Sequence, residues 1–500
     1  MEILSKKYKK DISFELSCYD RIILTGTIPE ISYSQGMTNY MNQNGHRIFD
    51  YPKFAEPYKE AIRANAERIA KEQSIEIEFL RKTCVRKESI ISNIIKKRGD
   101  HSGIVHILSA MEACNTYKPW HDKKTGKTFL KPDTSKCLHY YFYFIDEQVG
   151  LGYVRVPTWC PFRLQVYING HNLLASELRQ AGIKYSMIDN AFDSIEDSVK
   201  AQELSDKISL EKLHRKLDEF AWLFCPVYKD FNLRYHWSVM QAEYATDIVF
   251  KKQESLQQIY NELVATAIHT VKPENIATFL GNKLDPRYQG EVGNKYNVRI
   301  EGSRIKHTMG SVSIKMYDKF NKILRIETTT NDISFFKHFR EVVHRDGTTS
   351  HQMAPLKKNI YSLCSLADNL KASNRRYLEF ISAFDNKEIG RKRLEKVTAS
   401  KNENNRNYKG FNFFSVEDMA VLMAIVRGEF NINGFRNKNM QKLLGFKGSK
   451  ISRLIKRLRV HGLIKKANYS YKYYLTKFGK ETIIMAQKIK EIIIVPAYCH

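Results

Sequence analysis

The chain has few of the residues that build long linkers, disulfide frameworks or membrane spans. It contains only 12 Pro and 24 Gly in 500 residues, which predicts short loops. Its eight Cys form no CxxC pair, which favours reduced thiols in the cytoplasm over a disulfide scaffold. No stretch reaches the ~18 uninterrupted apolar residues of a transmembrane helix, and Met1–Asp20 lacks the apolar core of a signal peptide. We therefore expect a cytoplasmic protein with no membrane segment.

Acidic residues are scarce relative to basic ones. The sequence has 81 Lys and Arg against 54 Asp and Glu, a net charge of +27 and a pI near 9.5. Such a surplus attracts polyanions, and nucleic acid is the first candidate. An anionic membrane surface would need an amphipathic anchor or a polybasic run, and neither is evident. Hydrophobic residues make up 43% of the chain, enough for two to four packed domains.

The first 193 residues predict an α+β body with an antiparallel sheet. Strands are expected at 21–28, 75–81, 138–146, 152–157, 162–169 and 183–187, and helices at 54–73, 87–98 and 172–181. The segment 103–111 suits either helix or strand, and the Lys-rich segment 117–136 predicts a loop or hairpin. This order is typical of the α+β class.

Residues 194–390 predict a mostly helical second domain with one β-hairpin. Helices are expected at 195–205, 210–223, 237–252, 274–280 and 361–386, from apolar residues at i, i+3 and i+4. The hairpin is expected at 311–329, where alternation points Val312, Ile314 and Met316 inward. The same alternation points Lys315, Lys319 and Arg325 outward. The polar segment 391–410 then predicts a linker.

Residues 411–490 have the pattern of a winged helix-turn-helix. Ser415 is a natural N-cap for a first helix at 416–426, and a second helix is expected at 436–444. Ser449 would cap a third helix, in which Ile451, Leu454, Ile455 and Leu458 form one buried stripe. A wing would follow, in which residues 461–464 end the helix and begin a strand, 465–471 form the turn and 472–476 return as the second strand.

The third helix and the wing predict a nucleic-acid interface. Ser449 to Lys480 contains ten Lys and Arg, and Glu481 is the next acidic residue. A recognition helix in the major groove needs such a basic outer face, and the wing would lie against the backbone. The predicted contacts are Ser449, Lys450, Arg453, Lys456, Arg457, Arg459, Lys465, Lys466, Tyr471 and Lys472. A winged helix can also serve dimerisation, which keeps a homodimer open as an alternative.

Two further surfaces of the body are candidates for nucleic-acid contact. Cations near the expected hairpin predict a second basic patch, with a solvated hairpin as the alternative. Its members are Arg304, Lys306, Lys315, Lys319 and Arg325. The tyrosines of strand 138–146 are candidates for base stacking, although alternation places Tyr141 and Tyr143 on one face with His139.

Three arrangements would support enzyme chemistry. A rolling-circle-type nuclease needs metal-binding histidines and a nucleophilic tyrosine on a helix; His139, His171 and Tyr244 supply these types, but the chain has no His-x-His. A two-metal carboxylate site for phosphodiester cleavage could use Asp20, Glu88, Glu112 and Asp146. Either would require Mg²⁺ or Mn²⁺. A zinc site could use Cys114, His121, Cys137 and His139, but these spacings are not those of zinc fingers, so no cofactor is expected outright.

Long segments of the chain resemble a widespread, largely uncharacterised bacterial family. They include DRIILTGTIPEI, CLHYYFYFID, VRVPTWCPFRLQVYINGHN and RLIKRLRVHGLIKK. Members of that family are often labelled only by a C-terminal MarR-like winged helix. KMYDKFNKILRIE is also similar to hairpins of plasmid and phage replication initiators, whose His-x-His motif this chain lacks. The resemblance implies a bacterial source and a mobile-element context, and it assigns no catalytic residue.

The sequence therefore predicts a bacterial nucleic-acid-binding protein with double-stranded DNA as its partner. The alternatives are a metal-dependent nuclease or strand-transferase, and a protein that binds structured RNA or single-stranded DNA. A regulator needs only about a quarter of this length, so the body must have a further role.

Overall fold

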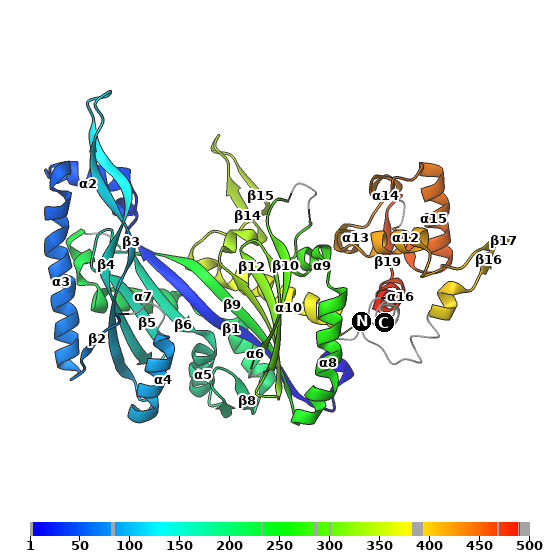
Figure 1. Cartoon of the computed structure of the whole chain (residues 1–500), viewed down its shortest axis with the longest axis horizontal. Helices are drawn as coiled ribbons and strands as arrows, with labels where there is room; N and C mark the ends of the chain where they lie inside the picture. Colours follow the sequence, from blue (N-terminus) through cyan, green and yellow to red (C-terminus); the bar gives the residue numbers. More distant parts are fainter. Residues whose placement is uncertain are drawn as a thin grey trace. The chain divides into compact units, whose positions relative to one another are not determined.

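The computed structural model of the chain is a mixed α/β protein (Figure 1). It describes residues 4–81, 86–231, 234–284, 288–299, 302–382, 394–467, 470–488 and 490. The chain forms two compact units. Unit 1 combines Met1–Glu15, Ala245–Thr328 and Asn369–His500, and unit 2 combines Leu16–Tyr244 and Thr329–Asp368. The units interleave along the chain, whereas the sequence suggested consecutive domains.

Unit 2 contains a sheet whose neighbouring strands run β1–β6–β5–β4–β3–β2. The pairs are antiparallel except β2 with β3, which is parallel. The bounds are β1 (Ile12–Thr27), β2 (Ile77–Phe79), β3 (Gly103–His121), β4 (Thr128–Asp146), β5 (Gly150–Pro157) and β6 (Leu164–Asn169). The antiparallel sheet is confirmed with the strands expected at 21–28, 75–81, 138–146, 152–157 and 162–169, and segment 103–111 is strand, whereas the strand expected at 183–187 pairs with β8 (Phe192–Ile195) in a separate two-stranded sheet.

The first face of this sheet is covered by aromatic side chains of a helix. Phe142 and Phe144 of β4 pack on Phe224 and Phe220 of α7 (Leu210–Phe224), with ring centroids 4.7 and 4.5 Å apart. Val154 of β5, on this same face, is fully buried. Burial of these apolar side chains is the main favourable contribution to packing α7 on the sheet.

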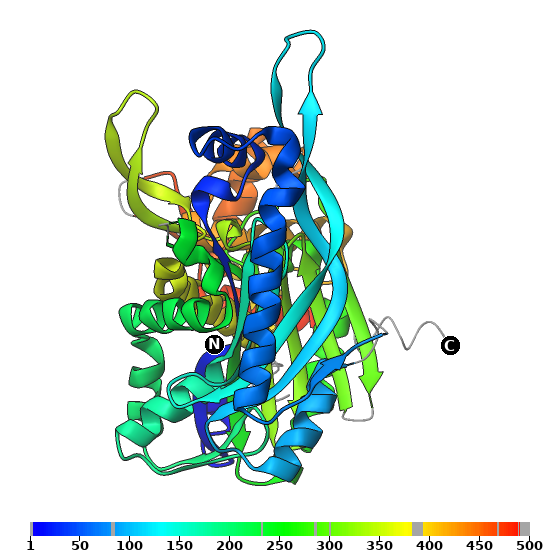
Figure 2. The ribbon, with the colours of Figure 1, turned by 90° about the vertical axis from the view of Figure 1, so that its left-hand side faces the viewer.

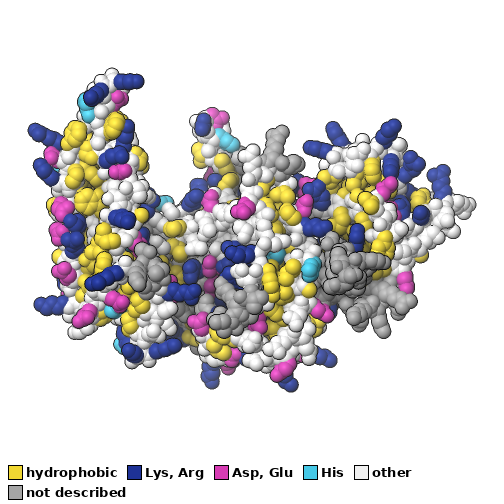
Figure 3. All heavy atoms as spheres, viewed as in Figure 1, with side chains coloured by type: hydrophobic (Ala, Val, Ile, Leu, Met, Phe, Trp, Pro, Cys, Tyr) yellow, Lys and Arg dark blue, Asp and Glu magenta, His cyan; other side chains and the backbone are white. Residues whose placement is uncertain are grey.

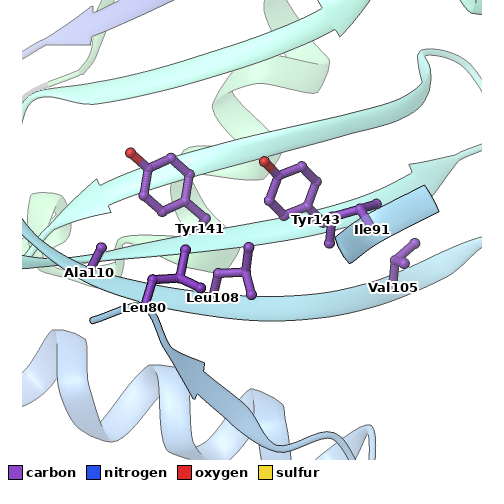
Figure 4. Packing of buried hydrophobic residues seen from close by; sticks show 7 residues of the cluster. All are labelled: Leu80, Ile91, Val105, Leu108, Ala110, Tyr141 and Tyr143. Atoms are coloured by element: carbon purple, nitrogen blue, oxygen red, sulfur yellow. The ribbon is translucent and has the colours of Figure 1, made fainter. Parts of the chain in front are cut away.

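The second face carries a smaller apolar cluster and a polar region. Leu80, Ile91, Val105, Leu108, Ala110, Tyr141 and Tyr143 are buried together under α4 (Lys87–Arg98), as Figure 4 shows. Tyr141 and Tyr143 are therefore core residues of this face, which limits their use for base stacking. Beyond the cluster, the face turns polar and aromatic.

The β3–β4 hairpin extends past the end of α3 (Tyr51–Glu72), as Figure 2 shows. The hairpin expected at 117–136 is confirmed, and both strands continue through it to a turn at 122–127. Asp122 holds this turn, because its side chain accepts hydrogen bonds from the Lys124 N–H and the Thr125 hydroxyl.

The other elements of unit 2 surround the sheet. They are α2 (Ser34–Gln43), α5 (Gly170–Gln180), β7 (Tyr185–Met187), β8 (Phe192–Ile195), α6 (Ser198–Asp206), β14 (Lys337–Val343) and β15 (Thr349–Pro355). The helices expected at 54–73, 87–98, 172–181 and 210–223 are confirmed within two to three residues.

The helix expected at 237–252 is wrong. This segment is strand β9 (His236–Phe250), whose last six residues belong to unit 1. Every side chain from Tyr244 to Phe250 is buried. In this end of β9 burial is continuous and includes the polar Thr246 and Asp247, so the pattern lacks the alternation of a half-buried strand, and apolar residues at helical spacing suggested a helix instead.

Unit 1 contains four neighbouring strands in the order β10–β11–β12–β13. Their bounds are β10 (Val292–Arg299), β11 (Gly302–Met309), β12 (Val312–Lys319) and β13 (Ile323–Thr330). The expected hairpin of β12 and β13 is confirmed, and Val312, Ile314 and Met316 are buried as predicted. With β9 and β14–β15 added, the segment 194–390 holds more strand than the mostly helical prediction allowed.

The remaining elements of unit 1 are mostly helices. They are α1 (Leu4–Lys7), α8 (Gln253–Thr270), α9 (Pro273–Phe279), α10 (Leu363–Ile381, partly in unit 2), α12 (Val416–Val426), α13 (Gly428–Asn433), α14 (Asn437–Leu444), α15 (Gly448–Val460) and α16 (Lys477–Lys488). Two short hairpins complete it: β16 (Lys401–Glu403) with β17 (Arg406–Tyr408), and β18 (Ile464–Lys466) with β19 (Tyr473–Leu475). The first lies in the segment expected as a linker.

Candidate nucleic-acid interface

The C-terminal part of unit 1 includes the three helices α12, α14 and α15 and the two-stranded hairpin of β18 and β19. α12 begins as predicted: the Ser415 hydroxyl accepts a hydrogen bond from the Asp418 N–H. α14 ends at Gly445, which adopts the left-handed conformation with φ of 68°, and α15 starts three residues later. Such a tight connection requires a residue that tolerates positive φ, and this is the use of Gly445.

The buried stripe of α15 is confirmed. Ile451, Leu454, Ile455 and Leu458 are all buried. The predicted cap is wrong, because the helix begins at Gly448 with Lys447 as its N-cap residue. Ser449 therefore lies within the first turn, where its hydroxyl is exposed rather than used for capping.

The hairpin of β18 and β19 lies where the wing was expected. Lys465 pairs with Tyr474 and Lys466 with Tyr473, and Phe435 forms a bridge to Tyr473 from before α14. Tyr471, at the end of this hairpin, is 81% exposed. Lys466 lies over the Tyr471 ring and Lys472 over the Tyr474 ring, at 5.0 and 5.7 Å from the centroids.

Arg457 was predicted to contact nucleic acid, but its guanidinium is used inside the protein. It donates two hydrogen bonds of 2.8 and 2.9 Å to the Asp418 carboxylate. It also donates to the Lys409 carbonyl at 2.8 Å and lies 3.9 Å from the centroid of the Phe411 ring. Since only 16% of its side chain is exposed, Arg457 ties α15 to α12 and is not a free contact.

Two other predicted contacts also have acidic partners. The Lys450 ammonium lies 2.9 Å from Glu417, and the Lys456 ammonium pairs with Glu403 of the β16–β17 hairpin. Hydrogen bonding to Lys456 lowers the pKa of the Glu403 carboxyl. Both lysines keep more than a third of their side chains exposed, so these pairs compete with a phosphate without preventing contact.

The exposed surface of α15 is small and cationic. Ser449, Ser452, Arg453 and Arg459 are exposed, opposite the buried stripe. Within the described residues Arg453 has no ion-pair partner. Ser452 was missed by the sequence analysis, although helical spacing places it beside Ser449 and Arg453.

α14 adds cations that the sequence analysis did not single out. Figure 3 shows Lys and Arg side chains on the surface over α14 and α15. The exposed cations of α14 and its flanks are Arg436, Lys438, Lys442 and Lys447. Asn437 ties the two helices together by donating to the Gly448 carbonyl at 3.1 Å and to the Ser452 hydroxyl at 2.7 Å. The sequence held a signal for these cations, because the second and third helices of a predicted helix-turn-helix lie together and their basic residues belong to one surface.

The second basic patch is only partly formed. Lys306 and Lys315 are cross-strand neighbours on β11 and β12, and Arg304 is the neighbour of Tyr317. The Lys315 ammonium lies 2.6 Å from Glu327, and Lys319 lies over the Phe320 ring. These contacts reduce the positive charge that the patch can offer.

Arg325 was predicted to point outward and is fully buried. Its guanidinium donates two hydrogen bonds of 2.7 Å to the Asp247 carboxylate. Nearby, the Asn374 amide donates to Thr246 and its carbonyl accepts from Thr328, at 3.2 and 2.6 Å. The prediction failed because every residue of β13 is buried, so alternation separates two buried faces and not core from solvent.

Tyr244 is not placed as a nucleophile. It lies on strand β9 rather than on a helix, only 1% of it is exposed, and its hydroxyl donates to the Ser17 carbonyl at 3.3 Å. Its ring packs edge-on against Tyr19. Burial raises the pKa of the Tyr244 hydroxyl well above its ordinary value, which opposes formation of a phenolate.

The two histidines of the rolling-circle hypothesis have separate partners. His139 is buried on β4 and hydrogen-bonds the Cys137 carbonyl at 3.1 Å; burial lowers its pKa to about 4. His171 is buried on α5, with its Nδ1 3.1 Å from the Asp20 carboxylate. They do not share a metal site in the described part of the chain.

The four zinc candidates do not converge either. Cys137 lies 3.8 Å from His139, and a hydrogen bond joins Cys114 to Cys137. His121 lies at the hairpin turn, where it hydrogen-bonds Thr128. Across the described ranges, these side chains form no group with three ligand atoms close enough for one ion.

Three of the four carboxylates of the two-metal hypothesis have partners of their own, and the fourth, Glu88, is exposed. Glu112 accepts hydrogen bonds from Tyr141, Arg155 and Lys87; burial raises its pKa, but these bonds outweigh it and lower the pKa to about 2. Asp146 caps the β4–β5 turn and pairs with Lys216 at 3.3 Å. Glu88 is exposed on α4, and Asp20 accepts from Asn190. These four carboxylates form no common cation site among the described residues.

Comparisons with known proteins add no relative. Within the described residues, no helix combines the length and the apolar character needed to cross a membrane. No family model, no curated protein and no solved structure matches this chain.

Proposed function

We propose that this chain binds double-stranded DNA through a winged helix formed by residues 415–475, with α15 as the recognition helix. The order α12–α13–α14–α15–β18–β19, in which α13 is a short helix between the first and second helices of the motif, and the short connection at Gly445 support this assignment. The bridge from Phe435 to β19 adds the short strand that joins a wing to the helices. In this arrangement the third helix enters the major groove and the wing follows the backbone.

The exposure of Arg453 carries the proposal. Arg453 shares the exposed side of α15 with Ser449 and Ser452. An arginine without an intramolecular acid is available for two hydrogen bonds to a guanine edge. The paired cations Arg457, Lys450 and Lys456 are less available, so Arg453 is the residue we expect to read bases.

The remaining cations, of which Lys472 is half-buried, suit phosphate contact. Lys438 and Lys442 on α14 and Lys465 and Lys472 on the wing lie at positions where helix-turn-helix proteins touch the backbone. They supply affinity that depends on salt and not on sequence. A bacterial, mobile-element setting follows from the resemblance alone, and we propose no catalytic step.

The test is selection of bound duplexes by the full-length protein from a random-sequence pool, followed by sequencing. We expect a recurrent motif, and we expect Arg453→Ala to weaken binding to it by about 1–3 kcal/mol. Arg345→Ala, in the exposed turn between β14 and β15, is the matched control and should leave binding unchanged.

Three outcomes would contradict the proposal. Recovery of no motif would remove sequence-specific reading. An equal loss of duplex affinity in Arg453→Ala and Arg345→Ala would show that only the overall positive charge matters. Tighter binding to a duplex RNA of the same length than to any DNA would point to shape recognition of RNA instead.

A further inference from the structure

Unit 2 contains a cleft of about 390 Å³ on the second face of its sheet, beyond the apolar cluster. Neighbouring strands β3, β4, β5 and β6 contribute to it, and Met240 lies at its rim with 52% exposure. The lining residues used below are Asn115, His139, Arg155, Trp159, Arg163 and Gln165. Small-molecule sites start near 300 Å³, so the volume suits a nucleotide better than a lone phosphate.

The charge of this cleft is positive. Arg155 is held in place by the Glu112 carboxylate at 2.8 Å. Arg163 is exposed, and no ion-pair partner for it occurs among the described residues. His139 is neutral at physiological pH because burial lowers its pKa to about 4. The available charge is therefore the Arg163 guanidinium, which matches one phosphate group.

An anchored aromatic ring lies beside this charge. The Trp159 indole N–H donates to the Thr116 hydroxyl at 2.9 Å, and the ring meets Tyr51 edge-on at 6.5 Å. Tyr51 in turn hydrogen-bonds the same Thr116 hydroxyl at 3.1 Å. An indole fixed in this way can stack a base with little loss of side-chain entropy.

Two amide side chains supply polar groups for a base edge. Gln165 donates to the Tyr153 hydroxyl at 3.2 Å, and this bond orients its amide. Asn115 is exposed at the rim on the β3 side. The rim also includes the exposed Ala113.

We propose that this cleft binds one unpaired nucleotide of a single-stranded nucleic acid, with its base against Trp159 and its phosphate on Arg163. The site is separate from the proposed duplex-binding surface of α14 and α15. A base in a duplex is already stacked and paired, so the cleft selects single strands, ends or displaced bases.

The first test is fluorescence anisotropy of the full-length protein with labelled oligo(dT) of about 12 nucleotides. We expect Arg163→Glu to weaken binding roughly tenfold, from loss of the phosphate contact and repulsion. Arg179→Glu makes the same charge change at an exposed site on α5 away from the cleft, and we expect less than about a twofold effect. Equal effects in the two variants would overturn the proposal.

Three further measurements test the base and its place. An oligomer of abasic sites of the same length should bind more weakly than oligo(dT), and equal binding would remove the base from the proposal. Photocrosslinking with 5-iodouracil should label the peptide that contains Trp159, whereas labelling confined to residues 436–475 would place the single strand elsewhere. Duplex binding should respond to Arg453→Ala and not to Arg163→Glu, so failure of one proposal is distinguishable from failure of the other.

Discussion

Helix α15 and strand β13 both carry arginine among periodically spaced apolar residues, but only the helix presents arginine to solvent. In α15 the apolar stripe occupies one side and Arg453 is exposed opposite it. In β13 every residue is buried, and Arg325 forms an ion pair inside unit 1. Periodicity therefore states which residues share a face, whereas the packing around an element decides whether that face meets water.

The largest expected effect follows from this contrast. Arg325→Ala leaves the Asp247 carboxylate buried without its partner, which should lower the free energy of unfolding by about 3–5 kcal/mol. Urea denaturation measures it. The double variant Arg325→Met with Asp247→Leu should recover much of the loss, because it removes both charges. A loss below about 1 kcal/mol for Arg325→Ala would contradict the buried pair.

Arg453→Ala should leave stability almost unchanged and affect binding instead. Because Arg453 is exposed and has no ion-pair partner among the described residues, we expect an unfolding free energy within about 0.5 kcal/mol of the original. Binding to the selected duplex should still fall, as proposed above. A clear loss of stability would mean that Arg453 serves the fold as Arg325 does.

Arg457 lies between these extremes. Arg457→Ala breaks the two hydrogen bonds to Asp418, which should destabilise the C-terminal helices by about 1–3 kcal/mol. Hydrogen exchange of α12 and α15 amides measures the local effect. Asp418→Asn should cause a similar increase in exchange. If Arg457→Ala leaves amide exchange unchanged but weakens duplex binding, Arg457 is a nucleic-acid contact after all.

A smaller effect is expected at Lys456. Glu403→Gln removes the acid that pairs with Lys456, which frees this lysine for a phosphate. Duplex binding should strengthen, and the slope of log affinity against log salt should steepen by about one. Glu395→Gln is a control that removes one acid from the same segment. An unchanged slope would show that Lys456 makes no backbone contact.

A pH-dependent effect concerns Asp318 at the end of β12. Burial raises its pKa to about 6, and its Oδ1 is buried without a hydrogen-bond partner. The folded state then holds this proton more tightly than the unfolded state, so stability should fall as pH rises from about 4 to 6. Asp318→Asn should flatten this part of the stability curve. If the free energy of unfolding of the original protein instead rises from about pH 4 to 6 relative to that of Asp318→Asn, the raised pKa is contradicted.

Local signals explain what could be predicted from the sequence. The helix at 87–98, the cap at Ser415 and the stripe of Ile451, Leu454, Ile455 and Leu458 depend on neighbours within one or two turns, and all are confirmed. The tyrosine-rich hairpin is confirmed for the same reason. Where strands are buried on both faces, as in β9, the local pattern is ambiguous and the prediction failed.

Candidate sites were harder to predict because they depend on partners far along the chain. His171 meets Asp20 from 151 positions away, and Arg325 meets Asp247 from 78 positions away. The cleft at Trp159 draws on β3, β4, β5 and β6, and no spacing in the sequence relates Asn115 to Arg163. The candidate sets of ionisable residues were therefore not the sets that the fold brings together.

The amino-acid sequence by itself determined the excess of positive charge, the antiparallel strands of the body and the amphipathic α15, because each is a property of composition or of adjacent residues. The tertiary structure decided which of those charges meet solvent: Arg453 and Arg163 are exposed, while Arg325 and Arg457 are enclosed by carboxylates. The physical reason is that removing a charge from water is costly unless another charge lies against it, and only the folded chain brings that second charge into place.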